Sequence, residues 1–363
     1  MVGSVPMLYP VILAGGSGTR FWPRSRRRRP KQAIAITGRR SMIQETVARL
    51  RRAFPAERIR VITNAVHAEA IREQLPDIPA HLIVAEPVGR DTAAAVGLGA
   101  ILVSSADPDA VMAVVTADHI VTPDDEFMRC LHAAEDLAVE YRALITFGVP
   151  PTSPSVLYGY VRRGEPVRDG PVKVFRLTAF KEKPDRAMAE EFVRSGEYYW
   201  NSGNFVWRAR DILDAIRLHM PDLHAALGRI VPAVGTPEQE RVLQREYPKL
   251  PKTSIDYGVM EKASNCLVIE ATFQWDDVGS WDAVARHNPA DPDGNTVMGL
   301  HAGIATRNCI IAGDREHLVA TIGIEGLIVV HTPDATLVCD RRNAGDVKRL
   351  VELLERRGLD RYL

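Results

Sequence analysis

A glycine-rich loop followed by basic residues is the first part of this sequence whose residue types could do chemistry. The stretch VILAGGSGTRFWPRSRRRRPKQ, residues 11–32, joins an apolar run to a glycine turn and then to a basic run. A glycine turn after the first strand of an α/β sheet brings backbone N–H groups to phosphate oxygens. Arginine can hold such oxygens bidentately, and lysine supplies a compact charge. The candidates for phosphate binding are Gly15, Gly16, Gly18, Thr19, Arg20 and Lys31.

The spacing of this loop excludes two familiar phosphate-binding motifs. The dinucleotide fingerprint GxGxxG, started at Gly16, would need a third glycine where Phe21 stands. The P-loop pattern needs a Gly-Lys pair, and the sequence contains none. The pattern that remains is G-G-x-G-T-R, followed after ten residues by Lys31.

Three aspartates stand where a metal ion could be held. VVTADHI places Asp118 after an apolar run, at the expected carboxyl edge of a sheet, and FQWDDVGSWDA offers Asp276 and Asp277. A magnesium ion that bridges phosphate oxygens commonly takes one or two protein carboxylates. Each aspartate could instead cap a helix. His119 could also bind a metal, but we expect it to orient the loop through a hydrogen bond.

The elements that would position these residues are read from the hydrophobic pattern. Over the first 150 residues, apolar runs such as YPVILA, RIRVIT, HLIVAE, VMAVVTAD and ALITFGV alternate with helices expected at 41–53, 64–75, 91–105 and 124–141. This alternation predicts an α/β fold with a mainly parallel sheet and helices on both faces.

The pattern changes twice further along the chain. After residue 150, shorter strands mix with helices around 185–195, 210–217 and 236–247, an insertion suited to covering a site on the sheet. From about residue 290, short β-type segments lead to an amphipathic helix at 344–357. We therefore expect a main domain at 1–287 and a small β-rich domain at 288–363 that ends in a helix. A few coils of a left-handed β-helix would suit the second domain.

The composition is that of an ordinary globular protein. The 363 residues are 46% hydrophobic and 25% charged with a formal net charge of zero, which gives no reason to expect a nucleic-acid or membrane partner. The uncharged stretch at 92–106 is shorter than the ~20 residues that span a bilayer. The four cysteines lack the spacing of a zinc site or a disulfide framework, which indicates free thiols in a reducing cytoplasm.

The glycine loop and the segment that follows it resemble the sugar-nucleotidyltransferase family, whose signature is a strand followed by AGGxGTRLxP and a PKx segment. FWPRSRRRRPKQ is most similar to the mannose-1-phosphate guanylyltransferase branch. The resemblance implies a Rossmann-like, GT-A-like catalytic domain at 1–287. It also implies that GTP and mannose 1-phosphate react to give GDP-mannose and pyrophosphate, with Mg²⁺ as cofactor.

The same resemblance implies roles for the catalytic candidates. It assigns Arg20 to the leaving β- and γ-phosphates, and Lys31 to the α-phosphate and the attacking sugar phosphate. It assigns Asp118 and Asp277 to the metal, because the family's W-x-D-x-G-x-W pattern selects Asp277 over Asp276. Joining two polyanions requires mainly charge neutralisation and in-line positioning. The second pKa of a sugar phosphate is about 6, so we expect no general base.

Further segments resemble the family's nucleotide and sugar contacts. AEPVGRDTAAAV, residues 85–96, resembles the base-binding segment, although the family commonly has asparagine at position 91, where the aspartate of this chain could equally cap a helix. TSIDYGVMEK, residues 253–262, is expected to form a helix behind the sugar site. The resemblance assigns nucleotide binding to Glu86, Arg90, Asp91 and Thr92, and sugar binding to Gly159, Glu182, Lys183, Asn201 and Asn204.

Several alternatives stay open at this point. Arg24 and the run Arg26–Arg29 could be only a solvated face, whereas a nucleic-acid patch is disfavoured because the chain is neutral. The substrates could be another hexose 1-phosphate or nucleotide, or the chain could be a non-catalytic regulatory subunit that binds sugar nucleotides. A fused isomerase domain would need at least ~100 residues after residue 363, so isomerase activity is not expected. A homodimer through the C-terminal domain is a further expectation.

Overall fold

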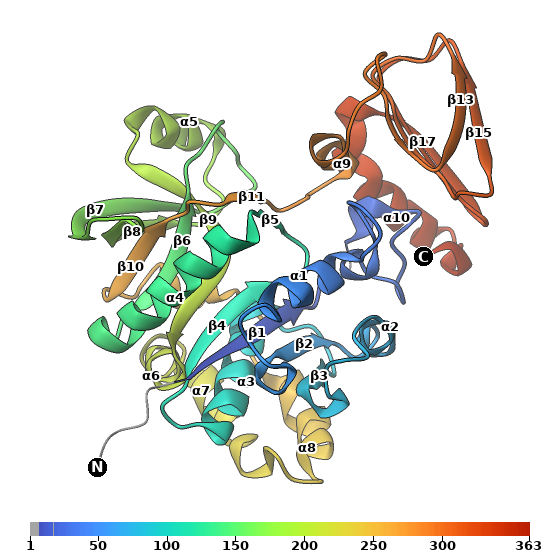
Figure 1. The fold of residues 1–363 in the computed structure, drawn as a ribbon. Coiled ribbons are helices and arrows are strands. Elements are labelled where there is room, and N and C mark those ends of the chain that lie inside the picture. Colours follow the sequence, from blue (N-terminus) through green and yellow to red (C-terminus); the bar gives the residue numbers. More distant parts are fainter. Residues whose placement is uncertain (1–6, 17) are drawn as a thin grey trace.

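A computed structural model describes residues 7–16 and 18–363 of the chain (Figure 1). A nine-stranded sheet with helices on both faces forms the larger part, and a smaller β-rich part lies at the C-terminal end. None of the helices in these residues combines the length and the apolar character needed to cross a membrane.

The large sheet carries the α/β fold that the sequence predicts. Its strand order is β3-β2-β1-β4-β9-β6-β10-β8-β7. Within it β1 is parallel to β2 and β4, whereas β9 runs antiparallel between β4 and β6. Only β8 and β9 of these described strands run against the others, so the sheet is mainly parallel. The strands are β1 (Leu8–Ala14), β2 (Arg60–Asn64), β3 (Ile83–Glu86), β4 (Val111–Thr116), β6 (Leu144–Val149), β7 (Tyr160–Arg168), β8 (Val174–Lys181), β9 (Tyr198–Arg208) and β10 (Cys266–Glu270).

Helices cover both faces of this sheet because neighbouring strand residues point to opposite sides. On β1, Ile12 packs into the core that contains α1 and α4, whereas Val11 packs into the core that contains α3 and α6. Ser41 and Gln44 form the capping box at the start of α1. The helices are α1 (Met42–Leu50), α2 (Ala68–Gln74), α3 (Asp91–Ala106), α4 (Asp124–Tyr141), α5 (Arg186–Ser195), α6 (Ala209–His219), α7 (Pro221–Gly228), α8 (Gln239–Glu246), α9 (Trp281–His287) and α10 (Val347–Arg356).

The C-terminal part is β-rich, as predicted, and its strands stack as coils. β12, β14 and β16 pair in parallel in one sheet, which β17 closes as an antiparallel strand, and β13 pairs in parallel with β15 in a second sheet. Equivalent strands that stack in parallel are the pattern of a β-helix, although its hand and the boundary at 287/288 stay predictions. These strands are β12 (Thr296–Met298), β13 (Leu300–Ile304), β14 (Ile310–Ala312), β15 (Leu318–Ile322), β16 (Leu327–Thr332) and β17 (Ala335–Asp340).

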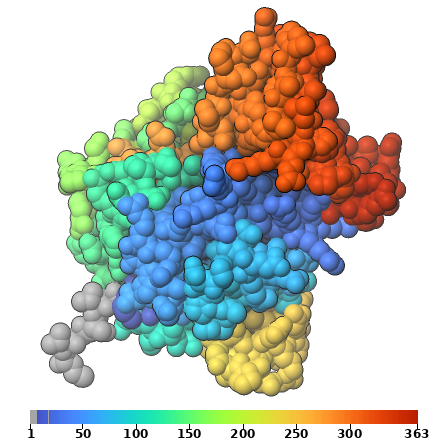
Figure 2. Space-filling model, turned by 45° about the vertical axis from the view of Figure 1, so that its right-hand side comes forward, coloured from blue at the N-terminus to red at the C-terminus, as the bar shows by residue number. Residues whose placement is uncertain are grey.

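The two parts of the molecule share an apolar core. Phe21, Trp22 and Ile34 of the N-terminal loop pack in one cluster with Trp281 of α9 and Val347 of α10. Figure 2 shows the orange and red C-terminal residues resting on the blue N-terminal surface. The loop that follows β1 therefore takes its shape partly from residues near the end of the chain.

Candidate active site

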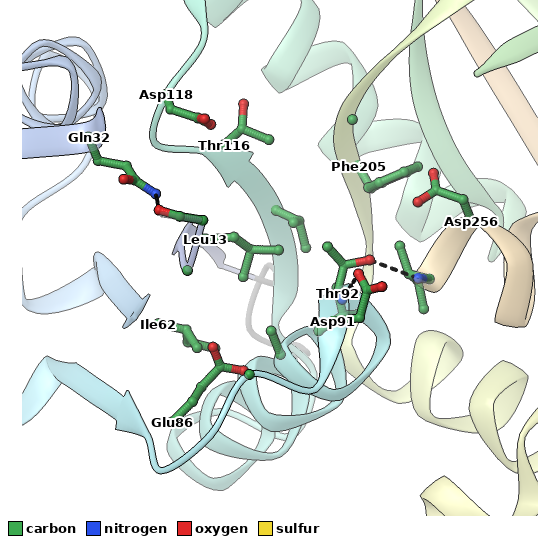
Figure 3. A pocket seen from close by; sticks show the side chains of 18 residues that line it. Leu13, Gln32, Ile62, Glu86, Asp91, Thr92, Thr116, Asp118, Phe205 and Asp256 are labelled. Carbon is green, nitrogen blue, oxygen red and sulfur yellow. Dashed lines mark hydrogen bonds between the residues drawn. The ribbon is translucent and has the colours of Figure 1, made fainter. Parts of the chain in front are cut away.

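A cavity of about 380 Å³ lies at the carboxyl edge of the parallel strands, where ligands of open α/β folds collect (Figure 3). Gly15 and Gly16 follow β1, Glu86 ends β3 and Asp118 follows β4, so these four predicted residues meet there although they are far apart in sequence. Its lining comprises Leu13, Gly15, Gly16, Gln32, Ile62, Glu86, Gly89, Asp91, Thr92, Ala95, Val96, Val114, Thr116, Asp118, Gly203, Phe205, Ile255 and Asp256.

The glycine loop packs directly against the lysine that follows it. Gly18 has a positive φ of 61°, and a Cβ atom added to it would lie 2.2 Å from Cβ of Lys31, so only glycine fits. Lys31 begins the short 3-10 turn Lys31–Ala33 and is 5% exposed. Arg20 lies in the neighbouring turn Thr19–Phe21, and its exposed side chain makes no hydrogen bond or ion pair with a described residue. The guanidinium of Arg20 is therefore available to a ligand, although Arg20 does not line the cavity.

Lys31 connects the two aspartates predicted for the metal. Its Nζ donates to Oδ2 of Asp118 at 3.0 Å and to the backbone carbonyl of Asp277 at 2.6 Å. These residues meet because β5 (Ile120–Thr122) pairs antiparallel with β11 (Gln274–Asp276). Burial raises the pKa of Asp118, but the ammonium group of Lys31 outweighs it and holds this pKa below its usual value. Asp118 is thus ionised at neutral pH.

Asp276 and Asp277 are adjacent but have different partners. The carboxylate of Asp276 accepts from Arg286 and from His287, each at 2.8 Å, and from the backbone N–H of Val278. Burial raises the pKa of Asp276, but these partners lower it to about 2. Asp277 instead accepts one hydrogen bond on Oδ1, from the hydroxyl of Tyr158 at 2.8 Å. The geometry therefore favours Asp277 over Asp276 as the carboxylate available to a ligand.

The donor set suits a divalent cation that takes its remaining ligands from phosphate and water. Asp118 and Asp277 supply carboxylate oxygens, and the ammonium of Lys31 joins them by donating to the carboxylate of Asp118 and to the backbone carbonyl of Asp277. The described residues contain no cluster of three or more His, Cys, Asp and Glu side chains that would enclose a metal without phosphate. His119 accepts from the indole N–H of Trp275 at 3.0 Å on Nδ1, which orients its ring, and its role in orienting the loop stays a prediction.

The segment predicted to bind the base lines the cavity in part. Glu86 is 5% exposed and accepts from the hydroxyl of Tyr247. Burial raises the pKa of Glu86 to about 7 although this hydrogen bond opposes the shift. Arg90 donates to the carbonyl of Pro248 and lies outside the cavity lining.

The residues at the start of α3 point toward the cavity. Asp91 has φ of 64° and is the first residue of the helix rather than its N-cap, and its Oδ1 accepts from the N–H of Thr92. Oγ1 of Thr92 accepts from the N–H of Ile255 at 2.9 Å, so the hydroxyl ties α3 to the segment that contains Asp256. Asp91 and Thr92 both line the cavity (Figure 3).

Four of the five residues predicted to bind sugar lie in one cluster. A Cβ atom on Gly159 would lie 2.4 Å from a carboxylate oxygen of Glu182, so glycine makes room for that side chain. Asn201 donates its backbone N–H to the carbonyl of Gly159 at 2.8 Å, and Nζ of Lys183 lies 2.9 Å from Glu182. The side chain of Asn204 has a different partner, because its Oδ1 accepts from the N–H of Thr116 and holds β9 against β4.

Sequence reasoning missed several residues at the site, although most stand inside the motifs that it used. Gln32 is the last letter of the RPKQ segment and donates to the carbonyl of Gly16 at 2.9 Å. Tyr158 opens the YGYV segment. Asp256 belongs to the segment expected to form a helix behind the sugar, but it begins a short π-helical turn, Asp256–Met260, and lines the cavity itself. Tyr247, which contacts Glu86, stands in no motif that the sequence offered.

The arginines between the glycine loop and Lys31 have protein partners in the C-terminal part. Arg24 donates to the carbonyl of Gly313 at 2.8 Å, and Arg26 pairs with Asp334 at 2.7 Å. Arg27 pairs with Glu355 and with Asp360. The interpretation as a merely solvated face is therefore wrong for Arg24 and Arg26, which are half-buried, whereas Arg27, Arg28 and Arg29 are exposed.

Comparisons with known proteins agree with this architecture. The family model described as nucleotidyl transferase matches residues 9–294, and a model described as a MannoseP isomerase/GMP-like beta-helix domain matches residues 299–354. A mannose-1-phosphate guanylyltransferase of Klebsiella pneumoniae is 39% identical over 98% of this chain and 76% of that protein. One of Escherichia coli has the same identity and coverage.

A solved structure is similar along nearly the whole chain. It is described as a mannose-1-phosphate geranyltransferase from Thermus thermophilus and is 35% identical to this chain. The match covers 96% of this chain and 99% of that one, with a TM-score of 0.84. The similarity therefore includes both the large sheet and the β-rich C-terminal part.

Proposed function

The chain belongs to the nucleotidyl transferase family, among the mannose-1-phosphate guanylyltransferases, and from this premise we propose that it transfers GMP from GTP to mannose 1-phosphate. The products are GDP-mannose and pyrophosphate. The observation that carries the proposal is the contact of Lys31 with the carboxylate of Asp118, which lines the cavity beside Gly15 and Gly16, and with the backbone carbonyl of Asp277. A fixed cation held by two aspartate residues supports the proposal, because the reaction brings two phosphate groups together and their negative charge must be neutralised.

The side chains of this site act mainly by binding and orienting charge. The sugar phosphate is already largely ionised at neutral pH, so its oxygen can attack the α-phosphorus without a general base. The ammonium of Lys31 neutralises charge between the two phosphates, and its hydrogen bonds fix its position before substrate arrives. The exposed guanidinium of Arg20 meets the β- and γ-phosphates, which depart as pyrophosphate.

A divalent cation is expected in this family, and we propose Mg²⁺ held by Asp118 and Asp277. When bound, the ion offsets negative charge on the triphosphate. Tyr158 orients Asp277 by donating to its Oδ1, and Lys31 keeps Asp118 ionised. Asp118 is thereby ready to bind a cation without first losing a proton.

Base selection is assigned to residues that line the cavity, and sugar selection to a cluster outside this lining, which Asn201 joins to the cavity residue Asp256. The roles proposed for Gly15, Gly16, Gly18 and Thr19 are backbone contacts to the nucleotide, and Glu86, Asp91 and Thr92 face the base. Gly159, Glu182, Lys183 and Asn201 face the sugar. Arg90 and Asn204 are already held by Pro248 and Thr116, so we propose that they position the neighbouring chain.

We also propose that two copies of the chain associate through the C-terminal part. Leu300 and Ile304 on β13 pair in register with Leu318 and Ile322 on β15, and all four side chains are about half exposed or more. Such an apolar surface favours contact with a matching surface, and a second copy supplies one.

Pyrophosphate release by the purified protein tests the proposed reaction. Turnover is expected with GTP, mannose 1-phosphate and Mg²⁺, and it should fall when ATP or UTP replaces GTP or when glucose 1-phosphate replaces mannose 1-phosphate. If the protein preferred another nucleotide or another hexose 1-phosphate, the reaction type would be as proposed and the substrates would differ. The proposal fails if no pair of nucleotide and hexose phosphate turns over.

A further inference from the structure

Asp256 is a carboxylate at the cavity to which neither the sequence motifs nor the mechanism above gives a role. It begins the π-helical turn that follows Ile255 and lines the cavity together with Gly203 and Phe205. Figure 3 shows Asp256 beside Phe205, on the side of the cavity opposite to Glu86. The residue therefore lies away from Glu86, although its neighbour Ile255 is hydrogen-bonded to Thr92 at the start of α3.

The hydrogen bonds of Asn201 fix its orientation toward Asp256. Oδ1 of Asn201 accepts from the hydroxyl of Thr146 at 2.7 Å and from the N–H of Gly203 at 3.3 Å. Its Nδ2 must then face the other way, and it donates to Oδ1 of Asp256 at 3.0 Å. Because Asn201 also binds Gly159, the carboxylate of Asp256 adjoins the cluster predicted to hold the sugar.

The charge around Asp256 decides which chemical group it can bind. Burial raises the pKa of Asp256 to about 7, and the nearby negative charge of Glu182 contributes to the shift. The nearest cation in this cluster, Lys183, is paired with Glu182 at 2.9 Å. Two carboxylates would repel a phosphate, but they are good acceptors for hydroxyl groups. The occupant that this surface fits is a neutral group with several hydroxyls.

We propose that Asp256 determines sugar specificity by accepting a hydrogen bond from a hexose hydroxyl, with Asn201 holding its carboxylate in place. This inference rests on the proposed function and extends it to a residue of the TSIDYGVMEK segment for which the sequence indicated no ligand contact. A hexose with the wrong configuration at that carbon would leave the carboxylate partly buried without its partner, which is the basis of discrimination between epimers.

The experiment compares two ligands that differ only in the mannose. Binding of GDP-mannose and of GDP is measured by calorimetry on the wild-type protein and on Asp256→Asn, which keeps the shape of the side chain. We expect GDP-mannose to bind the variant at least about 10-fold more weakly and GDP to bind it within about twofold of wild type. The Michaelis constant for mannose 1-phosphate should rise while that for GTP stays constant. Asp222 is an exposed carboxylate on α7, and Asp222→Asn is the matched control. It should change neither the two affinities nor the two Michaelis constants.

The other outcomes overturn the inference. If the affinities for GDP-mannose and GDP fell equally, Asp256 would contact the nucleotide rather than the sugar. If the affinity for GDP-mannose were unchanged, Asp256 would not contact the ligand at all. If Asp256→Asn does not fold, Asp256→Ser is measured in the same way, since serine removes the carboxylate without adding bulk. Failure of the proposed function would show differently, as absence of turnover by the wild-type protein.

Discussion

At the scale of single residues, Asp276 and Asp277 show how two neighbouring carboxylates take different tasks. Asp276 holds Arg286 and His287 of α9, whereas Asp277 faces Tyr158 and Lys31. The sequence could identify the pair because the spacing of tryptophan and glycine around it is distinctive. It could not show why Asp276 is unavailable, since the partners of Asp276 lie on a helix whose orientation only the fold determines.

The two aspartates should respond differently to removal of their charge. Asp277→Asn should lower kcat by at least about 100-fold and change the melting temperature by less than about 2 °C, because Asp277 acts on developing charge. Asp276→Asn should lower the free energy of unfolding by about 1–3 kcal/mol, because Arg286 loses its charged partner. Steady-state kinetics and thermal melts of both variants check this. A comparable loss of stability in Asp277→Asn would mean that Asp277 is structural.

Glu86 makes the stability of the protein depend on pH. The pKa of this carboxyl is raised from 4.5 to about 7, so the folded state binds its proton more tightly than the unfolded chain does. The stabilising contribution of Glu86 is therefore largest below 4.5, the pKa of this carboxyl in the unfolded chain, and is lost as the pH rises to about 7. Between pH 5 and 7.5 we expect Glu86 to lower the free energy of unfolding by about 2 kcal/mol.

Urea unfolding of the wild type and of Glu86→Gln at these two pH values isolates this effect. The glutamine variant keeps a hydrogen-bond acceptor for Tyr247 but cannot ionise. Its free energy of unfolding should therefore fall by about 2 kcal/mol less than that of the wild type between the two pH values. Equal decreases in both proteins would show that Glu86 ionises normally in the fold.

At the scale of secondary-structure elements, the last helix supports the loop that is proposed to bind phosphate. α10 contacts the turn Thr19–Phe21, which carries Arg20, and the indole N–H of Trp22 donates to the carbonyl of Tyr362 at 2.7 Å. The sequence predicted the elements well where a local pattern defines them, as with α4 and the strands β1, β2, β3, β4 and β6, whereas it gave no sign of β10. The partners of Arg26 and Arg27 could not be predicted from local pattern, because Asp334, Glu355 and Asp360 lie some 300 residues further along the chain.

Disrupting the packing of α10 should therefore affect catalysis from outside the cavity. Val347 is 3% exposed and shares a core with Phe21 and Ile34, so Val347→Asp should destabilise this contact and lower kcat at least about 10-fold. Lys348→Asp, on the exposed side of the same helix, is the control and should leave kcat within about twofold. Hydrogen exchange of residues 18–36 should rise only in Val347→Asp. If kcat stayed unchanged while hydrogen exchange of the loop increased, the packing of α10 would not be needed for catalysis.

At the scale of the whole molecule, the C-terminal coils have one side toward the catalytic part and another available for association. The first side contributes Ile310, Ile328 and Val330 to the core shared with Phe21 and Trp22. The second presents the apolar rows of β13 and β15. The sequence predicted a β-rich ending from its short, punctuated segments. Which strands stack, and which side chains stay exposed, depends on the register between coils, which local pattern does not specify.

The proposed association has a simple test in the oligomeric state. The wild-type chain should sediment as a dimer. The double variant Ile304→Asp with Ile322→Asp should sediment as a monomer, because burying the two carboxylates in the interface costs free energy. Both proteins should keep the same far-ultraviolet circular dichroism. A wild-type monomer at micromolar concentration would exclude this contact.

The central claim is that a phosphate oxygen of mannose 1-phosphate attacks the α-phosphorus of GTP. It is tested most directly with mannose 1-phosphate that carries oxygen-18 in its non-bridging phosphate positions, incubated with GTP, Mg²⁺ and the purified protein. Mass spectrometry should find GDP-mannose that retains the whole label and pyrophosphate that carries none. Labelled pyrophosphate, or GMP in place of GDP-mannose, would contradict the claim.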